Sequence, residues 1–271
     1  MRILGTFTAP HIHMVRLSSL LLAAACGLPL AASAGDDDTI STDRPDFVES
    51  SQVVGTGRLQ LETSLQWERE RADGVTARTL TTPTLLRIGL GATTELRFET
   101  DGRTVEHAGG ATTAGYADLS VGIKWHTADQ DGAAPSLGWL LHADLPSASA
   151  ALRGAGVRPS LRVAAEWELA NGVGFGIMPG VGTDNDERGA RRGYGILAAT
   201  VGRDITERLH GFVELAAPRI ARADRGGTQA SVDAGVTWLL TNDIQLDAAL
   251  TRGLNRRTAD LGIGLGLSVR R

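Results

Sequence analysis

The stretch GRLQLETSLQWERE, residues 57–70, alternates apolar and polar side chains. Successive side chains of an extended strand point to opposite faces, so Leu59, Leu61 and Leu65 share one face while charged and amide groups share the other. Such a strand requires an apolar medium on one side only. In a soluble sandwich that medium is a second layer of the same chain, whereas in an outer membrane it is lipid. The rest of the sequence distinguishes between the two.

The same alternation recurs to the end of the chain, and no window shows the period of a helix. With the opening stretch, twelve segments carry it, and the joints between them alternate in length. We expect tight turns at residues 91–93, 171–172, 204–206 and 241–242. We expect long polar loops at residues 69–77, 102–113, 146–156, 182–191, 217–227 and 254–259, while residues 126–135 break the pattern. Short turns at one end and long loops at the other are typical of outer-membrane barrels.

The tryptophans fall near the ends of the expected strands and always on the apolar face. If the first strand runs outward from the periplasm, the residues near periplasmic strand ends are Trp125, Trp139, Trp167 and Trp238. Trp67 falls near an external end. Aromatic rings in these places form the girdles of a membrane barrel, whereas a sandwich core would hold them in mid-strand. The sequence therefore predicts an all-β fold, a transmembrane antiparallel up-and-down β-barrel of twelve strands over residues 56–271.

The polar face of the expected strands supplies a charged lumen. The predicted pore-lining residues are Glu62, Arg97, Glu99, Asp118, Lys124, His142, Asp144, Arg162, Glu166, Asp233 and Asp247. Acids outnumber bases in this set, and carboxylate-lined pores favour cations, so a weak cation preference is expected of a conducting channel. In a soluble periplasmic β-sandwich that binds a ligand, the same residues would form the solvent side, and this alternative stays open.

Composition and charge narrow the function classes. The chain has 271 residues, of which 42% are hydrophobic and 21% charged, so it is neither disordered nor a helical membrane protein. Its net charge of −4 and the absence of a clustered basic face argue against nucleic-acid binding. The single cysteine, Cys26, excludes a disulfide framework.

The N-terminus carries a targeting signal. Arg16 is followed by an apolar run that ends in Ala32, Ser33 and Ala34, the small-x-small pattern that signal peptidase cleaves. We therefore expect residues 1–34 to be a cleaved signal peptide, with translation starting at Met14 as the alternative that gives the usual length. Residues 35–55 should form a periplasmic N-terminal strap that folds into the mouth of the barrel, and a solvated tail is the alternative. The expected location is the outer membrane of a Gram-negative bacterium.

Two terminal regions carry a family resemblance. The first includes Thr42, Asp43, Arg44, Pro45, Asp46 and Phe47, followed by the opening strand. The second, residues 241–268, matches in its Leu-Asp, Gly-Leu-Asn and Gly-rich elements. With both, the chain resembles a bacterial family of outer-membrane barrels labelled as the MetA pathway of phenol degradation.

This resemblance implies an outer-membrane channel or transporter for passive uptake of small solutes, with hydrophobic or aromatic compounds among the candidates. The expected partners are outer-membrane lipid and lipopolysaccharide, the barrel-assembly machinery and a small-molecule solute. Relatives usually end on an aromatic residue that serves as an assembly signal. This chain carries Arg271 at the outward-facing position instead, which leaves recognition by the assembly machinery open.

Enzymatic and metal chemistry find little support in the residues. The six histidines show no zinc-ligand spacing, so no cofactor or metal is predicted and the protein is not expected to be an enzyme. A lipid-modifying enzyme on a barrel scaffold, a lipase or deacylase, is the second hypothesis, because Ser120, His142 and Asp144 share the polar face of neighbouring strands. The acidic stretch at residues 184–187 is read as a solvated loop, with a calcium site as its alternative.

Overall fold

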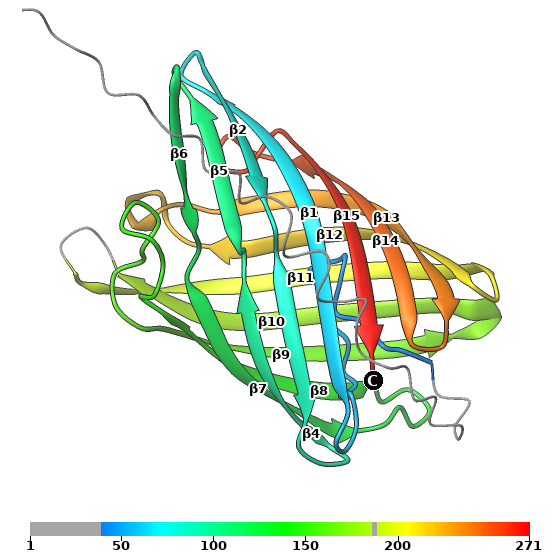
Figure 1. The fold of residues 1–271 in the computed structure, drawn as a ribbon. Coiled ribbons are helices and arrows are strands. Elements are labelled where there is room, and N and C mark those ends of the chain that lie inside the picture. The colour runs from blue at the N-terminus through cyan, green and yellow to red at the C-terminus, as the bar shows by residue number, and fades with distance from the viewer. Residues whose placement is uncertain (1–38, 186–188) are drawn as a thin grey trace, which may run out of the picture. The chain divides into compact units, whose positions relative to one another are not determined.

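Fifteen strands make one antiparallel sheet in the computed structural model, which describes residues 39–185 and 189–271 (Figure 1). The first eight are β1 (Leu59–Ala72), β2 (Val75–Thr81), β3 (Thr84–Gly89), β4 (Thr94–Thr100), β5 (Arg103–Ala108), β6 (Ala111–Tyr116), β7 (Leu119–Ala128) and β8 (Ser136–Leu145). The remaining seven are β9 (Arg158–Leu169), β10 (Val173–Asn185), β11 (Arg191–Thr206), β12 (Leu209–Ile220), β13 (Gln229–Thr241), β14 (Ile244–Gly253) and β15 (Leu261–Arg270). Two short 3₁₀ turns lie at Ala170–Gly172 and Ala223–Arg225.

The sheet closes on itself because β15 pairs with β1. Leu65 lies opposite Leu265, and at the seam the amides of Leu59 and Arg271 each donate to the other residue's carbonyl, at 2.7 and 2.8 Å. Closure satisfies the backbone groups of both edge strands, which a strand in lipid requires. None of the helices among the described residues is long and apolar enough to span a bilayer.

Three barrel strands are each built from two pieces, so the fifteen pieces make twelve barrel strands. β1 pairs with β3 along its first half and with β2 along its second half. In the same way, β4 continues as β5, and β6 continues as β7. The breaks at residues 82–83, 101–102 and 117–118 lie side by side, since Thr82 N donates to Asp101 O and Ala117 N to Gly102 O. The prediction of a twelve-stranded antiparallel barrel is confirmed.

Two of the long loops expected from sequence are tight hairpins instead. Residues 69–77 continue β1 and β2 around a two-residue turn at Asp73 and Gly74, and residues 102–113 hold β5 and β6 around Gly109 and Gly110. Positive φ angles at both central residues of each turn give the form that matches strand twist, which Asp-Gly and Gly-Gly favour. High charge suggested loops, but strands extend past the membrane wherever cross-strand hydrogen bonds continue.

Other boundaries also shift outward. β10 extends to Asn185 and β12 to Ile220, so part of the loops expected at residues 182–191 and 217–227 is strand. The tight turn expected at residues 204–206 lies at residues 207–208, because β11 runs to Thr206. The predicted signal peptide, residues 1–34, lies outside the described residues.

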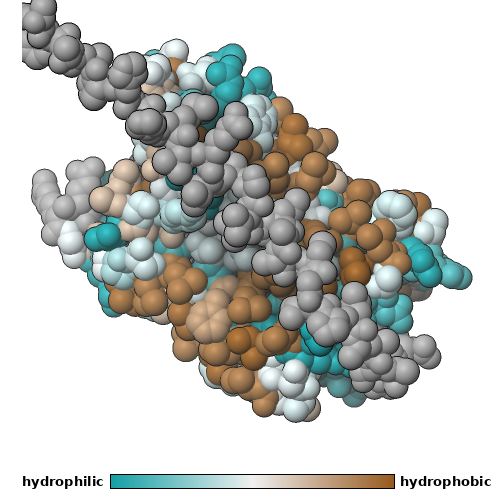
Figure 2. Space-filling view, in the orientation of Figure 1, coloured by the Kyte–Doolittle hydropathy of each residue, from teal (hydrophilic) through white to brown (hydrophobic). Residues whose placement is uncertain are grey.

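The alternation of the sequence becomes two distinct surfaces of one wall. Leu59, Leu61 and Leu65 are exposed on the outer surface of β1, whereas Gln60 and Glu62 between them are buried inside. Figure 2 shows hydrophobic residues spread over the middle of the visible wall and hydrophilic residues toward its ends. A single closed wall with its apolar residues outside has no second layer to cover them, so the sandwich alternative is excluded.

An arginine placed on the outer surface at mid-wall should destabilise the barrel by a bounded amount. Leu265 is 60% exposed and pairs with Leu65 and Ala248. Leu265→Arg should lower the free energy of unfolding in lipid vesicles by about 2–4 kcal/mol, the cost of a cation at the bilayer midplane. Leu254→Arg, in the loop between β14 and β15, is the matched control and should stay within about 0.5 kcal/mol of the parent. Equal effects of the two variants would contradict the lipid-facing assignment.

Candidate functional site: the charged lumen and the segment within it

Residues 39–58, which we call the inner segment, run through the interior of the barrel. Near its start, Gln245 Nε2 on β14 donates to Thr42 Oγ1 at 2.8 Å. In its middle, the amides of Phe47 and Val48 donate to the carboxylate of Glu214 on β12, at 2.8 and 2.7 Å. Because these strands lie on a different part of the wall from β3 and β4, which hold its other end, the inner segment crosses the lumen.

The far end of the inner segment is held by two further wall carboxylates. Val54 N donates to Glu95 Oε2 at 2.9 Å, and Ser51 N donates to Glu166 Oε2 at 2.5 Å. Ser51 Oγ and Ser136 Oγ share a hydrogen bond of 2.7 Å. The segment forms no strand, so the amides of Asp43, Phe47, Val48, Ser51 and Val54 donate to carboxylates of the wall instead of to a ladder.

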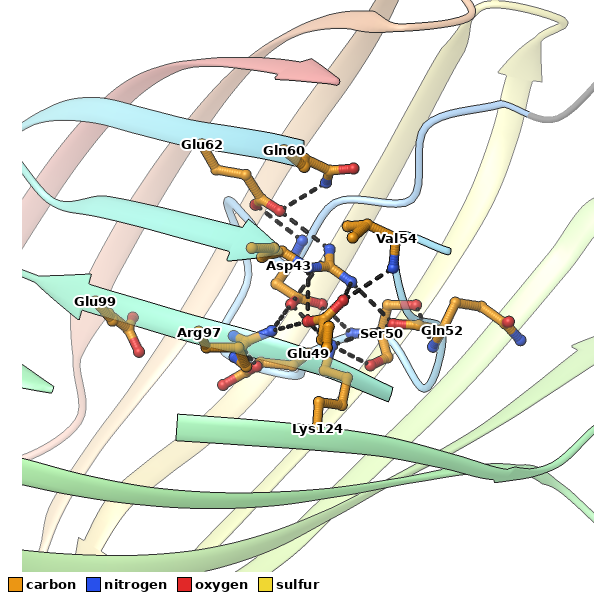
Figure 3. A network of polar contacts seen from close by, with 12 residues as sticks. Asp43, Glu49, Ser50, Gln52, Val54, Gln60, Glu62, Arg97, Glu99 and Lys124 are labelled. Atoms are coloured by element: carbon orange, nitrogen blue, oxygen red, sulfur yellow. Dashed lines mark hydrogen bonds and ion pairs between the residues drawn. The ribbon is translucent and has the colours of Figure 1, made fainter. Parts of the chain in front are cut away.

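Asp43 is the centre of a buried ion-pair network (Figure 3). Its carboxylate accepts from Arg97 Nη1 at 2.5 Å and from Lys124 Nζ at 2.9 and 2.8 Å, and the amide of Ser50 donates to it at 2.9 Å. Arg87 Nη1 lies 3.3 Å from the same carboxylate. Burial favours the neutral acid, but the three cations outweigh it and hold the pKa of Asp43 well below its ordinary value.

Arg87 is fully buried, and all five of its N–H donors have acceptors. Nε and Nη2 donate to the two carboxylate oxygens of Glu95, at 2.8 and 3.0 Å, in the bidentate geometry that guanidinium favours. Nη1 donates to Glu62 at 3.1 Å. The remaining donors reach carbonyl oxygens of the inner segment, on Ser41 at 2.8 Å and Gln52 at 2.9 Å. Such complete pairing offsets the cost of burying the guanidinium group.

Apolar contacts hold the segment on the opposite wall. Val48 packs in a buried cluster with Met178, Ala198 and Ala216 from β10, β11 and β12. Phe47 packs against this cluster, and the guanidinium of Arg162 lies 5.6 Å from its ring centroid. Ion pairs on one side of the lumen and apolar packing on the other fix the position of the segment.

The structure places the predicted pore-lining residues on the inner surface. Glu62, Arg97 and Lys124 belong to the Asp43 network. Other members contact the inner segment at single points: Glu99 pairs with Arg44 at 3.2 Å, Arg162 pairs with Glu49 at 2.8 Å, and Glu166 accepts from Ser51. Glu62 in turn accepts from the amide of Asp43 at 2.9 Å.

The remaining predicted residues lie apart from the inner segment. Asp118 accepts from Arg158 Nη2 at 2.8 Å and from the amides of Ala148 and Gly154, which fastens loop 146–157 at the other mouth. Asp144 lies 3.7 Å from Arg158. Asp233 accepts from Ser231 at 2.9 Å. Asp247 occupies the space that a side chain at Gly266 would fill, since a Cβ there would lie 2.3 Å from its Oδ2.

Three charged residues of the site were not in the predicted set: Arg87, Glu95 and Glu214. Arg87 sits between outward-facing Leu86 and Ile88, Glu214 sits between Val213 and Leu215, and Glu95 alternates with Leu96. Applying the alternation rule at every position would have found them. Glu49 of the inner segment, whose carboxylate pairs with Arg97 at 2.5 Å, lies outside any strand, so the alternation rule does not identify it.

The arrangement expected of a hydrolase does not form. His142 and Ser120 share no hydrogen bond, and neither ring nitrogen of His142 nor Ser120 Oγ has a hydrogen-bond partner among the described residues. The nearest carboxylate oxygen to His142 Nδ1 belongs to Glu99, at 3.7 Å. A catalytic triad requires a base within hydrogen-bond distance of its nucleophile.

A calcium site also finds no support in the described part of the chain. Asp184 lies on β10, not in a loop, and accepts from Arg219 at 3.1 Å. Asp186 and Glu187 lie outside the described residues. Within residues 39–185 and 189–271, no group of three or more His, Cys, Asp or Glu side chains is arranged to hold a metal ion.

Comparison with known families agrees with the resemblance seen in the sequence. The model of the family described as "Putative MetA-pathway of phenol degradation" matches residues 42–270, which include both the inner segment from Thr42 and the last strand. The chain belongs to this family. No curated protein matches the sequence.

Solved structures share the fold at low sequence identity. An outer membrane channel from Pseudomonas putida F1 superposes with a TM-score of 0.64 at 13% identity, over 82% of this chain and 98% of that one. The β-domain of the Bordetella autotransporter BrkA gives a TM-score of 0.53 at 14% identity, over 79% of this chain and 99% of that one. The fold of this chain is of the same kind as that of the outer-membrane channel.

Neutralising Asp43 should release the inner segment without opening the barrel. Asp43→Asn leaves Arg97 and Lys124 without their shared carboxylate, and removing one partner of a buried ion pair costs about 3–5 kcal/mol. Hydrogen exchange measured by mass spectrometry in detergent micelles should therefore show faster exchange across residues 41–54. Asp131→Asn, at an exposed position between β7 and β8, is the control and should exchange like the parent. Unchanged protection in Asp43→Asn would contradict the central role of Asp43.

The docking of the inner segment should strengthen as pH falls. Burial and the facing carboxylate of Glu214, with smaller effects from Glu166 and Asp43, raise the pKa of Asp46 well above its ordinary value. The docked state therefore favours protonated Asp46. Ionised Asp46 opposes docking fully at pH values above its raised pKa, and not at all at pH values below its ordinary pKa. Exchange of residues 41–54, corrected for intrinsic rates, should be slower at pH 5 than at pH 8. Asp46→Asn should reduce this difference, and a variant with the parent's pH dependence would refute the assignment.

Proposed function

We propose that the protein is an outer-membrane channel for the passive passage of small solutes, and that the inner segment forms its constriction. The observation that supports this most is a closed barrel, apolar outside and charged inside, whose lumen holds a segment fixed by ion pairs to facing strands. Export through a cleaved signal peptide and insertion by the barrel-assembly machinery are parts of the proposal.

The width of the barrel supports a narrow path. Eight-stranded barrels are filled by their own side chains, whereas sixteen-stranded porins leave an open aqueous channel. A twelve-stranded barrel lies between them, and here Asp43, Val48 and Ser51 of the inner segment are buried inside it. Solutes must therefore pass beside the segment or displace it, which restricts passage to small molecules.

The family description directs the choice of solute. Because the family is described by phenol degradation, small aromatic compounds are the first class to test. Neither a catalytic constellation nor a metal group appears among the described residues, and a transport role needs neither. A lumen lined by buried carboxylates and guanidinium groups offers hydrogen bonds to hydroxyl and carboxylate substituents of such solutes.

Single-channel recording of the refolded protein tests the channel. The parent should show a small conductance with a weak cation preference, and Asp43→Asn should conduct more because its inner segment is released. Asp131→Asn should record like the parent. Absence of conductance in both the parent and Asp43→Asn, together with lipid hydrolysis that His142→Ala abolishes, would favour the enzyme alternative.

A further inference from the structure

The outer surface of β1 changes from apolar to basic at one position. Up to Trp67 its outward residues are mainly apolar, and the next two outward residues are Arg69 and Arg71. Figure 2 shows hydrophilic residues gathered at this end of the wall, where β1 and β2 meet in their hairpin. The residues of β1 still alternate between the two faces, but beyond Trp67 the outward residues are arginines and not apolar side chains.

Neighbouring strands repeat this change in register. Trp67 lies opposite Leu80, which lies opposite Val105, so an apolar row crosses β1, β2 and β5. One pleat further out, Arg69 lies opposite Arg78, which lies opposite His107. Directly opposed residues of an antiparallel pair share a face. We call Arg69, Arg71, Arg78 and His107 the basic patch; it borders the apolar row.

Within the described residues, no acidic side chain pairs with the arginines of the basic patch. No side chain or carbonyl among the described residues accepts a hydrogen bond from Arg69, Arg71 or Arg78, and Arg69 Nε is buried without a partner. Glu68 and Glu70 alternate with these arginines in β1 and therefore point to the inner surface. These two acids are thus on the other side of the wall, and the acid of the hairpin turn, Asp73, forms no ion pair with the basic patch among the described residues.

The opposition of Arg69 and Arg78 is itself unfavourable. Like charges directly opposite in a sheet destabilise the pair, and nothing else in the described structure compensates it. An anion bound between the two guanidinium groups would replace their repulsion by attraction of both to the anion, since phosphate accepts bidentate hydrogen bonds from arginine. The geometry indicates an anionic ligand outside the barrel.

The position of the basic patch selects the ligand. It lies at the end of the barrel opposite to the inner segment and the C-terminus, on the side of the long loop at residues 146–157, which is the external end when long loops face outward as in outer-membrane barrels (Figure 1). The apolar row beneath it belongs to the lipid-facing surface, so a ligand in contact with both has phosphates and acyl chains. We propose that the basic patch binds the phosphate groups of lipopolysaccharide in the outer leaflet, with acyl chains against the Trp67, Leu80 and Val105 row.

Native mass spectrometry of the refolded full chain in detergent tests this binding. The probes are bisphosphorylated lipid A, the same lipid A with its phosphates removed, and inorganic phosphate. Arg69→Gln/Arg78→Gln should weaken binding of bisphosphorylated lipid A by at least about tenfold, since each charge-assisted hydrogen bond contributes about a factor of ten or more. The matched control, Arg203→Gln/Arg208→Gln, removes two arginines at the other end and should bind like the parent.

Each outcome decides for or against the proposal. Binding of bisphosphorylated lipid A that depends on Arg69 and Arg78, with weak binding of the dephosphorylated lipid, supports it. Equal binding of both lipids would show apolar contact alone, and inorganic phosphate that displaces lipid A at equimolar concentration would show a simple anion site. Equal loss in both double variants would show a general charge effect, and each of these three results would overturn the proposal. Unchanged gel mobility of the unheated variants checks that the barrel has formed.

Discussion

Every backbone polar group that faces hydrocarbon must find its hydrogen-bond partner within the protein, and the pairing of β15 with β1 meets this requirement for the two edges of the sheet. Closure has consequences for both surfaces. It forces one face of each strand toward lipid and the other into a narrow interior, so alternation along the chain becomes a separation of apolar and charged residues across one wall. The charged interior then has to be neutralised from within.

The inner segment supplies that neutralisation. In the central cluster, the wall contributes the cations Arg87, Arg97 and Lys124 but only the carboxylates Glu62 and Glu95. Asp43 and Glu49 of the segment add the missing negative charge, and its carbonyls accept the remaining donors of Arg87 and Lys124. Segment and wall therefore stabilise each other. A buried network of this kind favours one position of the segment over many, because each alternative would leave buried charges unpaired.

The extension of β1, β2, β5 and β6 shows the same separation beyond the apolar row of Trp67, Leu80 and Val105. Its inward residues are acidic and its outward residues basic, so the two signs cannot meet across the wall. Inside the barrel the chain provides a counter-charge, in the form of the inner segment. Outside it does not, and this difference is why the basic patch points to a ligand that the membrane supplies.

The alternation of apolar and polar residues in the sequence determined much of the fold of this protein. Alternation is a property of one strand, so the sequence alone predicted the strand number, the outward tryptophans and the inward position of residues such as Glu62 and Lys124. The same rule, applied at every position, also identifies Arg87 and Glu95 as inward residues. The lengths of the external hairpins were misjudged, because charge does not end a strand while its neighbour continues to pair.

Only the tertiary structure decided which inward charges meet. Asp43 and Arg97 are 54 positions apart, and Phe47 and Glu214 are 167 apart, so their contacts depend on how the closed sheet brings distant strands around one lumen. The opposition of Arg69 and Arg78 likewise depends on the register of two strands, which a single-strand pattern does not contain. Periodicity specifies the face of a residue, whereas its partner is set by closure and register, which are properties of the whole barrel.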